Sequence, residues 1–581
     1  MAPECSLIAP LLHLVVALAA VAGAGGAGAG ARDIEVPAPA PPPPLLAPFR
    51  LPSILASDML LQRGKPAKIW GWAAPGAAVR VALDGGAAPV IVDAKPDGTF
   101  AAVLSAQSAA LNRTLTVTCR SCSQSSSTSI VIENLAFGDL FVCSGQSNME
   151  YTIAGTFNHS AEISASAEPG LRLVTVAKRK ANTPQTDTTL ETYGWGVAGP
   201  NTTQDSTHPT SVFGYPFSAT CYYFGRDLHR QLGSVPVGLI STSWGGCCIE
   251  PWMTPRALRQ CGAPPSSAMF NQMMAPLLPL ALSGLVWDQG ECNTNNPELY
   301  SCLFPAFIKE LRVQFDNPQL AFLFVQIGPS SSNALTDKFG YRNDSYGVPL
   351  LAVRHAQLAA LSLPRVGMAS AVDLGDPGCK AGVGGCMGVV GDNGLFGGHP
   401  RVKQPVGARL AALGLSIVYN QSQYATVGPA LVGVPSRGRP GNLFLTLDYG
   451  TPVVLANTTM CGLFTAQKGN RAGGVCCTAS PFELSSDGGE HWMRTMMPRV
   501  QSDGTLQIVL PADYRATHLR YAWADTPMCM VYASKHCNPT AHGSHACPQV
   551  ALPSIPFNIS LSGHVDAAQA AWSNAAGVVR R

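Results

Sequence analysis

The chain has 581 residues, well beyond the roughly 250–300 at which a single core stops growing, so two or three domains are expected. Its 38 basic and 35 acidic residues nearly balance, which argues against nucleic acid as a partner because phosphate backbones are neutralised by clustered lysine and arginine. Only 13% of the residues are charged, and the 58 glycines and 47 prolines favour β-rich structure with many turns.

The first residues have the character of a secretory leader. An apolar run from Leu7 to Ala22 precedes glycines and alanines that suit signal-peptidase cleavage. The alternative is an uncleaved anchor, but the run is shorter than the roughly 20 residues that cross a bilayer. We therefore expect a signal peptide over residues 1–28, no stable membrane span elsewhere, and a secreted or lysosomal protein.

Cysteines and glycosylation sequons favour the same compartment. Of the 18 cysteines, Cys5 lies in the expected leader, which leaves an odd number and at least one thiol that is free or paired between chains.

A C-terminal cluster contains residue types that bind zinc, but its spacing fits no zinc finger well and disulfides are favoured, so no metal or cofactor is expected. The cluster comprises Cys529, His536, Cys537, His542, His545 and Cys547. Candidate glycosylation sites are Asn112, Asn158, Asn201, Asn343, Asn420, Asn457 and Asn558.

The segment after the leader is a linker, and a β-domain follows it. Residues 29–49 are rich in proline, with seven prolines from Pro37 to Pro48, and they predict a stiff extended linker. Residues 50–135 contain short β-type runs separated by turn residues, which predicts a small β-sandwich. These runs are Lys68–Trp72, Val79–Leu83 and Leu115–Cys119.

Residues 136–425 alternate buried strands with helical patterns, which predicts a three-layer α/β/α domain around a parallel sheet. The expected strands are Leu140–Cys143, Pro236–Thr242, Gly284–Trp287, Ala321–Ile327 and Gly367–Asp373. Apolar residues recur at helical spacing in Thr220–Leu232 and Leu351–Leu361.

Short strands return in residues 426–562, which predicts a second β-sandwich-like domain. The expected strands are Leu443–Leu447, Leu506–Leu510 and Leu519–Trp523. Residues 563–581 remain as a tail.

A serine lies where the first strand of the α/β region ends, in Gly138-Asp-Leu-Phe-Val-Cys-Ser-Gly-Gln-Ser-Asn-Met149. This is not the Gly-x-Ser-x-Gly elbow of α/β-hydrolases, since Met149 stands two residues after Ser147. The segment resembles the first signature block of the SGNH hydrolases, in particular their sialate O-acetylesterase branch. The resemblance implies that Ser147 is a nucleophile; the alternative is a serine that only caps the following helix.

The best candidate base is His399, in Gly397-Gly-His-Pro-Arg-Val-Lys-Gln404. The following proline favours a loop, and we place this loop between the last strand and a helix, where α/β sheets build their sites. The block also resembles the last block of the family, which implies a Ser-His pair. Many members have an aspartate two or three residues earlier, but Phe396 and Gly397 stand there, so Asp376 and Asp392 are the candidates to assist His399.

Two further blocks are expected to supply oxyanion or substrate contacts. Gly245 and Gly246 follow an apolar strand, where glycines expose backbone amides to a ligand. The run Trp287-Asp-Gln-Gly-Glu-Cys-Asn293 resembles a family block, which implies that Gln289 and Asn293 lie beside the pocket and that Glu291 anchors them from behind.

These residues predict a serine esterase that removes O-acetyl groups from carbohydrates without a cofactor. Sialic acids are the substrate that the resemblance implies, and acetylxylan or another polysaccharide is the alternative. A non-enzyme alternative is an inert carbohydrate-binding protein, because the adjacent aspartate is missing and a glycine-rich insertion spans Cys379–Gly398. The oligomeric state is left open.

Overall fold

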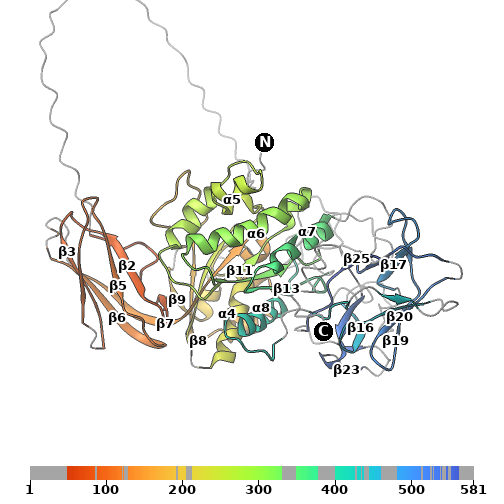
Figure 1. The fold of residues 1–581 in the computed structure, drawn as a ribbon. Helices are drawn as coiled ribbons and strands as arrows, with labels where there is room; N and C mark the ends of the chain where they lie inside the picture. Colours follow the sequence, from red (N-terminus) through yellow and green to blue (C-terminus); the bar gives the residue numbers. More distant parts are fainter. Residues whose placement is uncertain are drawn as a thin grey trace, which may run out of the picture.

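The structure is a computed structural model that describes residues 49–561 with gaps. The gaps are 86–87, 121, 123–128, 192–193, 205–211, 234, 330–348, 377–398, 425–427, 433–434, 438–443, 459–479, 512–513, 524–526, 528, 537, 540–544 and 547–550. The expected signal peptide, nearly all of the expected linker, and the tail 563–581 lie outside the described residues. Figure 1 shows β-sheet regions on either side of a central part that contains the helices.

The N-terminal part consists of short antiparallel strands. β2 pairs with β5, and β3 pairs with both β4 and β6. Side chains alternate between core and surface along β3 and β5, as expected when one face of a sheet is covered. The three strands that were predicted here are confirmed. The bounds are β1 Leu60–Gln62, β2 Ala67–Trp72, β3 Ala78–Leu83, β4 Val90–Asp93, β5 Thr99–Leu104 and β6 Ala110–Cys119.

The strand β7, Ser129–Gly145, runs through both the N-terminal and the central parts. Its first half pairs antiparallel with β6, and its second half lies between the parallel strands β10 and β11. From Leu135 onward every residue of β7 is buried. The predicted strand Leu140–Cys143 was therefore only the buried centre of a longer strand, which crosses the expected domain boundary at residue 135 without a linker.

The central sheet has the order β13-β12-β11-β7-β10-β8-β9 and is parallel except for β9. The mostly parallel sheet and its five predicted strands are confirmed, although β13 ends at Ser370 and not at Asp373. Two strands at one side of the sheet, β8 and the edge strand β9, were not predicted. The bounds are β8 Glu168–Thr175, β9 Gly196–Ala198, β10 Val237–Ser243, β11 Gly284–Asp288, β12 Ala321–Gln326 and β13 Val366–Ser370.

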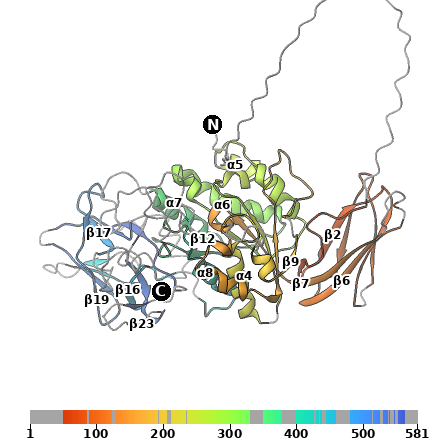
Figure 2. The same cartoon turned by 180° about the vertical axis from the view of Figure 1, so that it is seen from behind.

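Helices cover both faces of this sheet, with α5, α6 and α7 on one face and α4 and α8 on the other (Figures 1 and 2). Neighbouring residues of one strand accordingly enter different cores: Phe322 packs in one and Leu323 in the other. The α-helices are α1 Ser147–Glu150, α2 His159–Ser164, α3 Pro200–Thr203, α4 Ala219–Leu232, α5 Pro255–Gln260, α6 Pro297–Gln314, α7 Pro349–Leu358 and α8 Gln404–Ile417. The short 3-10 or π turns are η1 Ile153–Gly155, η2 Glu250–Trp252, η3 Phe270–Met274, η4 Ala275–Leu277, η5 Glu291–Asn295, η6 Ala359–Ser362 and η7 Ser534–His536.

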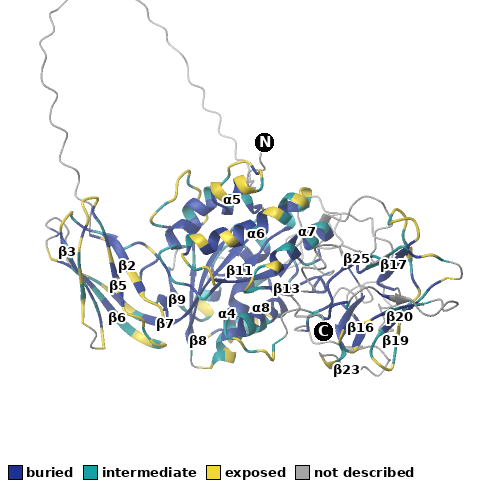
Figure 3. Cartoon of the chain, in the orientation of Figure 1, coloured by how far each residue is buried: buried dark blue, intermediate teal, exposed yellow. Residues whose placement is uncertain are grey.

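The C-terminal part consists of three four-stranded sheets around a third core. Figure 3 shows buried strands in all three parts of the chain. The buried ion pair between Arg409 and Asp373 joins this part to the central one, since Tyr532 also donates to Asp373. The bounds are β14 Ser436–Arg437, β15 Phe444–Leu447, β16 Val453–Asn457, β17 Phe482–Ser485, β18 Met493–Arg494, β19 Arg499–Val500, β20 Leu506–Val509, β21 His518–Tyr521, β22 Cys529–Ala533, β23 Asn538–Pro539, β24 His545–Ala546 and β25 Phe557–Ser560.

Four disulfides between described cysteines lie within the N-terminal and central parts of the chain, one in the first and three in the second. The pairs are Cys119–Cys122, Cys143–Cys221, Cys248–Cys292 and Cys261–Cys302. Cys247 and Cys529 are also disulfide-bonded, and no free cysteine occurs among the described residues. Cys529 is thus a disulfide partner, while the other two cysteines of the C-terminal cluster lie outside the described residues. Within the described ranges, no helix is both long and apolar enough to cross a membrane.

Candidate active site

Ser147 is presented at the carboxyl end of β7 by a tight turn. Gly145 has a φ of 146°, and a Cβ at this position would lie 2.1 Å from the carbonyl oxygen of Asp288. The same carbonyl accepts a hydrogen bond of 2.9 Å from the Gln146 amide. This close approach of two strand ends requires glycine. Ser147 then begins α1 with its side chain half-buried.

His399 lies in contact with Ser147, although 252 positions separate the two residues. Its Nε2 is 2.7 Å from the Ser147 Oγ, which is hydrogen-bond distance. The imidazole packs edge-on against Phe213, with ring centroids 4.9 Å apart, and is nearly parallel to Tyr151 at 6.4 Å. His399 precedes α8 and follows β13, as the sequence predicts.

Asp376 contacts the segment that carries His399. Its side chain is fully buried, and its oxygens accept hydrogen bonds from the Arg401 Nε at 2.6 Å and from the Arg401 backbone amide at 3.2 Å. The hydrogen bond to Asp376 raises the pKa of Arg401 against the opposing effect of burial. Asp376 therefore anchors the chain two residues beyond His399. Asp392 lies outside the described residues.

The turn at Gly245 and Gly246 lies against Ser147. A Cβ on Gly245 would be 3.3 Å from the Ser147 Cβ, so the two residues are in close contact. The Gly245 amide donates to the carboxylate of Glu150, which also accepts from Lys178 at 2.6 Å. The Gly245 donor is thus occupied, whereas Gly246 is exposed and its amide has no hydrogen bond within the described ranges. Sequence reasoning missed Glu150, whose only signal was its place in the same block as Ser147.

Gln289 and Asn293 form an internal network at the end of β11. They are 0% and 5% exposed, and the Gln289 Nε2 donates to the Asn293 Oδ1 at 2.7 Å. Tyr300 donates to Gln289, and Asn293 donates to Glu250 and accepts from the Ile249 amide. These amides therefore hold the Ile249–Glu250 segment to the end of β11.

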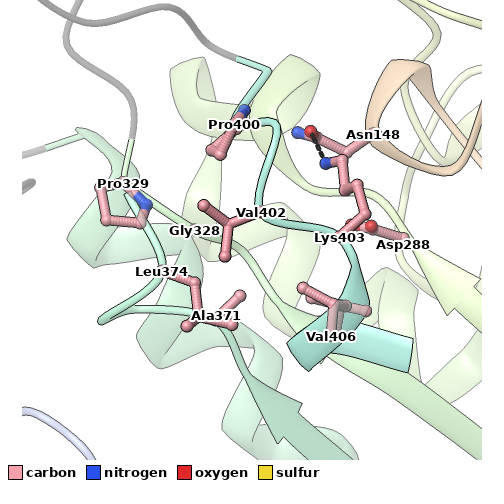
Figure 4. A pocket seen from close by; sticks show the side chains of 11 residues that line it. Asn148, Asp288, Gly328, Pro329, Ala371, Leu374, Pro400, Val402, Lys403 and Val406 are labelled. Carbon is pink, nitrogen blue, oxygen red and sulfur yellow. Dashed lines mark hydrogen bonds between the residues drawn. The ribbon is translucent and has the colours of Figure 1, made fainter. Parts of the chain in front are cut away.

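A pocket beside the nucleophile turn contains a buried cluster of charged groups (Figure 4). Lys403 donates to Asn148 at 2.6 Å, and Asn148 donates to Glu291 at 2.7 Å. Burial raises the pKa of Asp288 to about 7 and also raises that of Glu291. Burial lowers the pKa of Lys403, while the charges of Asp288 and Glu291 oppose this shift. The predicted anchoring position of Glu291 fits this contact, but sequence reasoning missed Asn148 and Lys403.

Comparison with known proteins identifies the domain that contains Ser147. Residues 137–378 match the family described as carbohydrate esterase, sialic acid-specific acetylesterase. The segment that carries Ser147 is thus similar to a carbohydrate esterase domain. The chain is 29% identical over 556 residues to the sialate O-acetylesterase of Homo sapiens, a match that covers 88% of this chain and 92% of the relative. The Mus musculus sialate O-acetylesterase is 27% identical and matches over 83% and 92% of the two chains.

The fold is shared with a solved carbohydrate esterase as well. A carbohydrate acetylesterase from Xanthomonas citri superposes with a TM-score of 0.67 at 24% identity, over 88% of this chain and 99% of that one. The shared fold includes the central sheet and the β-sheet regions beside it. With the family match and the curated relatives, the chain is a carboxylic ester hydrolase.

Proposed function

We propose that this esterase hydrolyses O-acetyl esters of carbohydrates through an acetyl-serine intermediate, with O-acetylated sialic acids as its substrates. The observation that carries the proposal is the 2.7 Å contact between the Ser147 Oγ and the His399 Nε2. An alcohol beside an imidazole is the arrangement that activates serine for acyl transfer. The family match and the relatives support the acetyl ester and the sugar.

In the first half-reaction, the His399 Nε2 takes the proton of Ser147 as the Oγ attacks the acetyl carbonyl carbon. The oxyanion is held by the amides of Ser147 and Gly246, since Ser147 begins α1 and the Gly245 amide is occupied. One preorganised donor of this kind contributes about 3 kcal/mol to lowering the barrier. The tetrahedral adduct collapses, the sugar oxygen leaves with the proton from His399, and the acetyl group stays on Ser147.

In the second half-reaction, water attacks the acetyl-serine. His399 takes a proton from the water and returns it to the Ser147 Oγ as acetate leaves. Asp376, which also holds Arg401, and Asp392 are the two candidates for the carboxylate that assists the imidazole. Gln289 and Asn293 shape the site through their internal hydrogen bonds at the end of β11.

We also propose the domain organisation and the cellular route of the chain. Residues 136–425 form an SGNH-type three-layer domain, flanked by β-sandwich-like domains at 50–135 and 426–562. A signal peptide, 1–28, directs the chain to the secretory pathway, for secretion or delivery to lysosomes. The disulfides support this route, as do exposed sequon asparagines at Asn112, Asn158, Asn201 and Asn420.

The test is acetate release from a panel of O-acetylated sialic acids, acetylated xylan fragments and a simple chromogenic acetyl ester. The proposal predicts the highest kcat/KM for a sialic acid, and an activity that rises with pH as His399 loses its proton. Equal rates on xylan fragments would reject sialic acid as the preferred substrate. A flat profile from pH 5 to 8 would reject His399 as the base.

A further inference from the structure

We propose that Lys403 is a positioning residue, which holds the nucleophile turn and the base loop together through a side-chain bridge from Lys403 to Asn148 to Glu291. The inference rests on the proposed function, because it assigns a role in keeping Ser147 and His399 within proton-transfer reach. It concerns three side chains other than those of Ser147 and His399.

The bridge joins three separate segments at the carboxyl edge of the sheet. Lys403 follows His399 by four residues and precedes α8, Asn148 directly follows Ser147, and Glu291 begins η5 after β11. The Lys403 Nζ donates to the Asn148 Oδ1 at 2.6 Å, and the Asn148 Nδ2 donates to the Glu291 Oε1 at 2.7 Å. The first of these contacts is drawn in Figure 4. It links the same two segments as the contact between His399 and Ser147.

The chemistry of the partners fixes the Asn148 amide in one orientation. An ammonium group only donates, so it must face the amide oxygen, and an ionised carboxylate only accepts, so it must face the NH2. Turning the amide over would break both contacts at once. Asn148 is 6% exposed, so water does not readily replace either partner.

Lys403 is also linked to the base through an aromatic ring. Its Nζ lies 5.3 Å from the centroid of the Tyr151 ring, and that ring lies nearly parallel to the His399 imidazole at an angle of 12°. Lys403 therefore contacts a neighbour of the nucleophile and a neighbour of the base.

A buried cation at this position needs compensation. Lys403 is 4% exposed, and moving an ammonium group out of water is costly unless opposite charge is near. Asp288 and Glu291 supply that charge, and Asp288 lines the same pocket as Lys403. The buried Lys403 cation is thus compensated only when the base loop and the end of β11 are assembled.

The test compares Lys403→Met with wild type on a chromogenic acetyl ester. Because a misplacement of about 1 Å can cost about 100-fold in rate, we expect kcat to fall by roughly that factor while KM changes little. Arg312→Met is the matched control: Arg312 is also buried, but it donates to the carbonyls of Leu320 and Pro364, which precede β12 and β13 at the opposite edge of the sheet. This control should lower the free energy of unfolding and leave kcat unchanged.

Two further variants separate positioning from simple support of the fold. If Lys403 and Asn148 act through one bridge, Lys403→Met combined with Asn148→Ala should lower kcat no more than the worse single change. Glu291→Gln keeps an oxygen that accepts from Asn148 and should retain most of the activity, whereas Glu291→Ala should lose it. Additive losses, or a normal kcat in Lys403→Met, would overturn the bridge.

A second readout needs no acetyl substrate: the rate at which a fluorophosphonate probe labels Ser147. The bridge predicts slow labelling in Lys403→Met and normal labelling in Arg312→Met. Fast labelling of wild type without acetate release would reject the proposed function alone. Equal labelling of wild type and Lys403→Met, or no labelling of wild type, would overturn the bridge.

Discussion

The Gly245 amide donates a hydrogen bond to the Glu150 carboxylate, and this contact holds the turn after β10 next to the nucleophile Ser147. Glu150 is at the end of α1, the short helix that Ser147 begins, so both residues move with the same turn. The glycine backbone fits closely there, because a Cβ on Gly245 would be 3.0 Å from the Glu150 carboxylate and 3.3 Å from the Ser147 Cβ. Glu150 thus fixes where the exposed Gly246 amide lies relative to Ser147.

Glu150→Ala is therefore expected to lower kcat by about 10- to 100-fold, through misplacement of the Gly246 amide. Glu150→Gln keeps an acceptor for the Gly245 amide and should lose less. Lys178→Met is the control, since it removes only an ion pair whose lysine is 38% exposed, and such pairs contribute little. Steady-state kinetics on a chromogenic acetyl ester provide the measurement. Equal losses in Glu150→Ala and Lys178→Met would contradict this account.

The turn before Ser147 should not tolerate a side chain. Gly145→Ala places a Cβ 2.1 Å from the Asp288 carbonyl oxygen, so the ends of β7 and β11 must separate. We expect a clear fall in the midpoint of urea unfolding together with loss of activity. Gly64→Ala is the control, because Gly64 also has a positive φ of 67° but has open space around its Cβ position. If both variants unfold at the same midpoint, backbone strain and not the close approach explains the glycine.

The disulfides should differ in their contribution to stability. In the chain-entropy description, closing the 78-residue separation of Cys143–Cys221 contributes about 4.5 kcal/mol to the free energy of unfolding, against about 2 kcal/mol for the three-residue separation of Cys119–Cys122. Double alanine variants of each pair, unfolded in urea, measure the difference. A larger loss for the Cys119–Cys122 pair would contradict the prediction.

The sheet and the Ser-His pair could be read from the sequence because each has a local signal. Buried strands such as β12 contain continuous apolar runs, here Ala321–Val325, and the blocks around Ser147 and His399 resemble those of a known family. The strand β8 was missed because a proline and a glycine interrupt its start, Glu168-Pro-Gly170. β9 has only three residues, too few for a pattern.

The contacts that organise the site could not be predicted in the same way. Two of these contacts, Glu150–Gly245 and Lys403–Asn148, each join residues that are far apart in sequence. Whether such residues meet depends on how the ends of the strands align. The Gln289 side chain donates a hydrogen bond to Asn293. The resemblance to the family block had implied only that both residues lie beside the pocket. Burial of an amide or an ammonium group is a property of the assembled sheet and gives no local signal in the sequence.

Asp288 makes stability depend on pH. Burial raises its pKa to about 7, whereas an unfolded aspartate titrates near 3.9. The folded state therefore binds this proton more tightly, and the resulting stabilisation is complete below about pH 3.9 and is lost as the pH rises through about 7. Asp288→Asn cannot ionise and should lose less stability than wild type between these limits.

Urea unfolding of wild type and Asp288→Asn from pH 4 to 8 measures this difference. Asp93→Asn serves as the control because it changes an exposed aspartate. Parallel stability curves for wild type and Asp288→Asn would contradict the prediction.

The most direct measurement is acetate release from an O-acetylated sialic acid by wild type and by Ser147→Ala, with folding of both checked by their unfolding midpoints. We predict that wild type releases acetate and that Ser147→Ala is slower by at least about 1,000-fold, because the oxyanion donors alone leave only residual catalysis. A folded Ser147→Ala protein that releases acetate at the wild-type rate would contradict it.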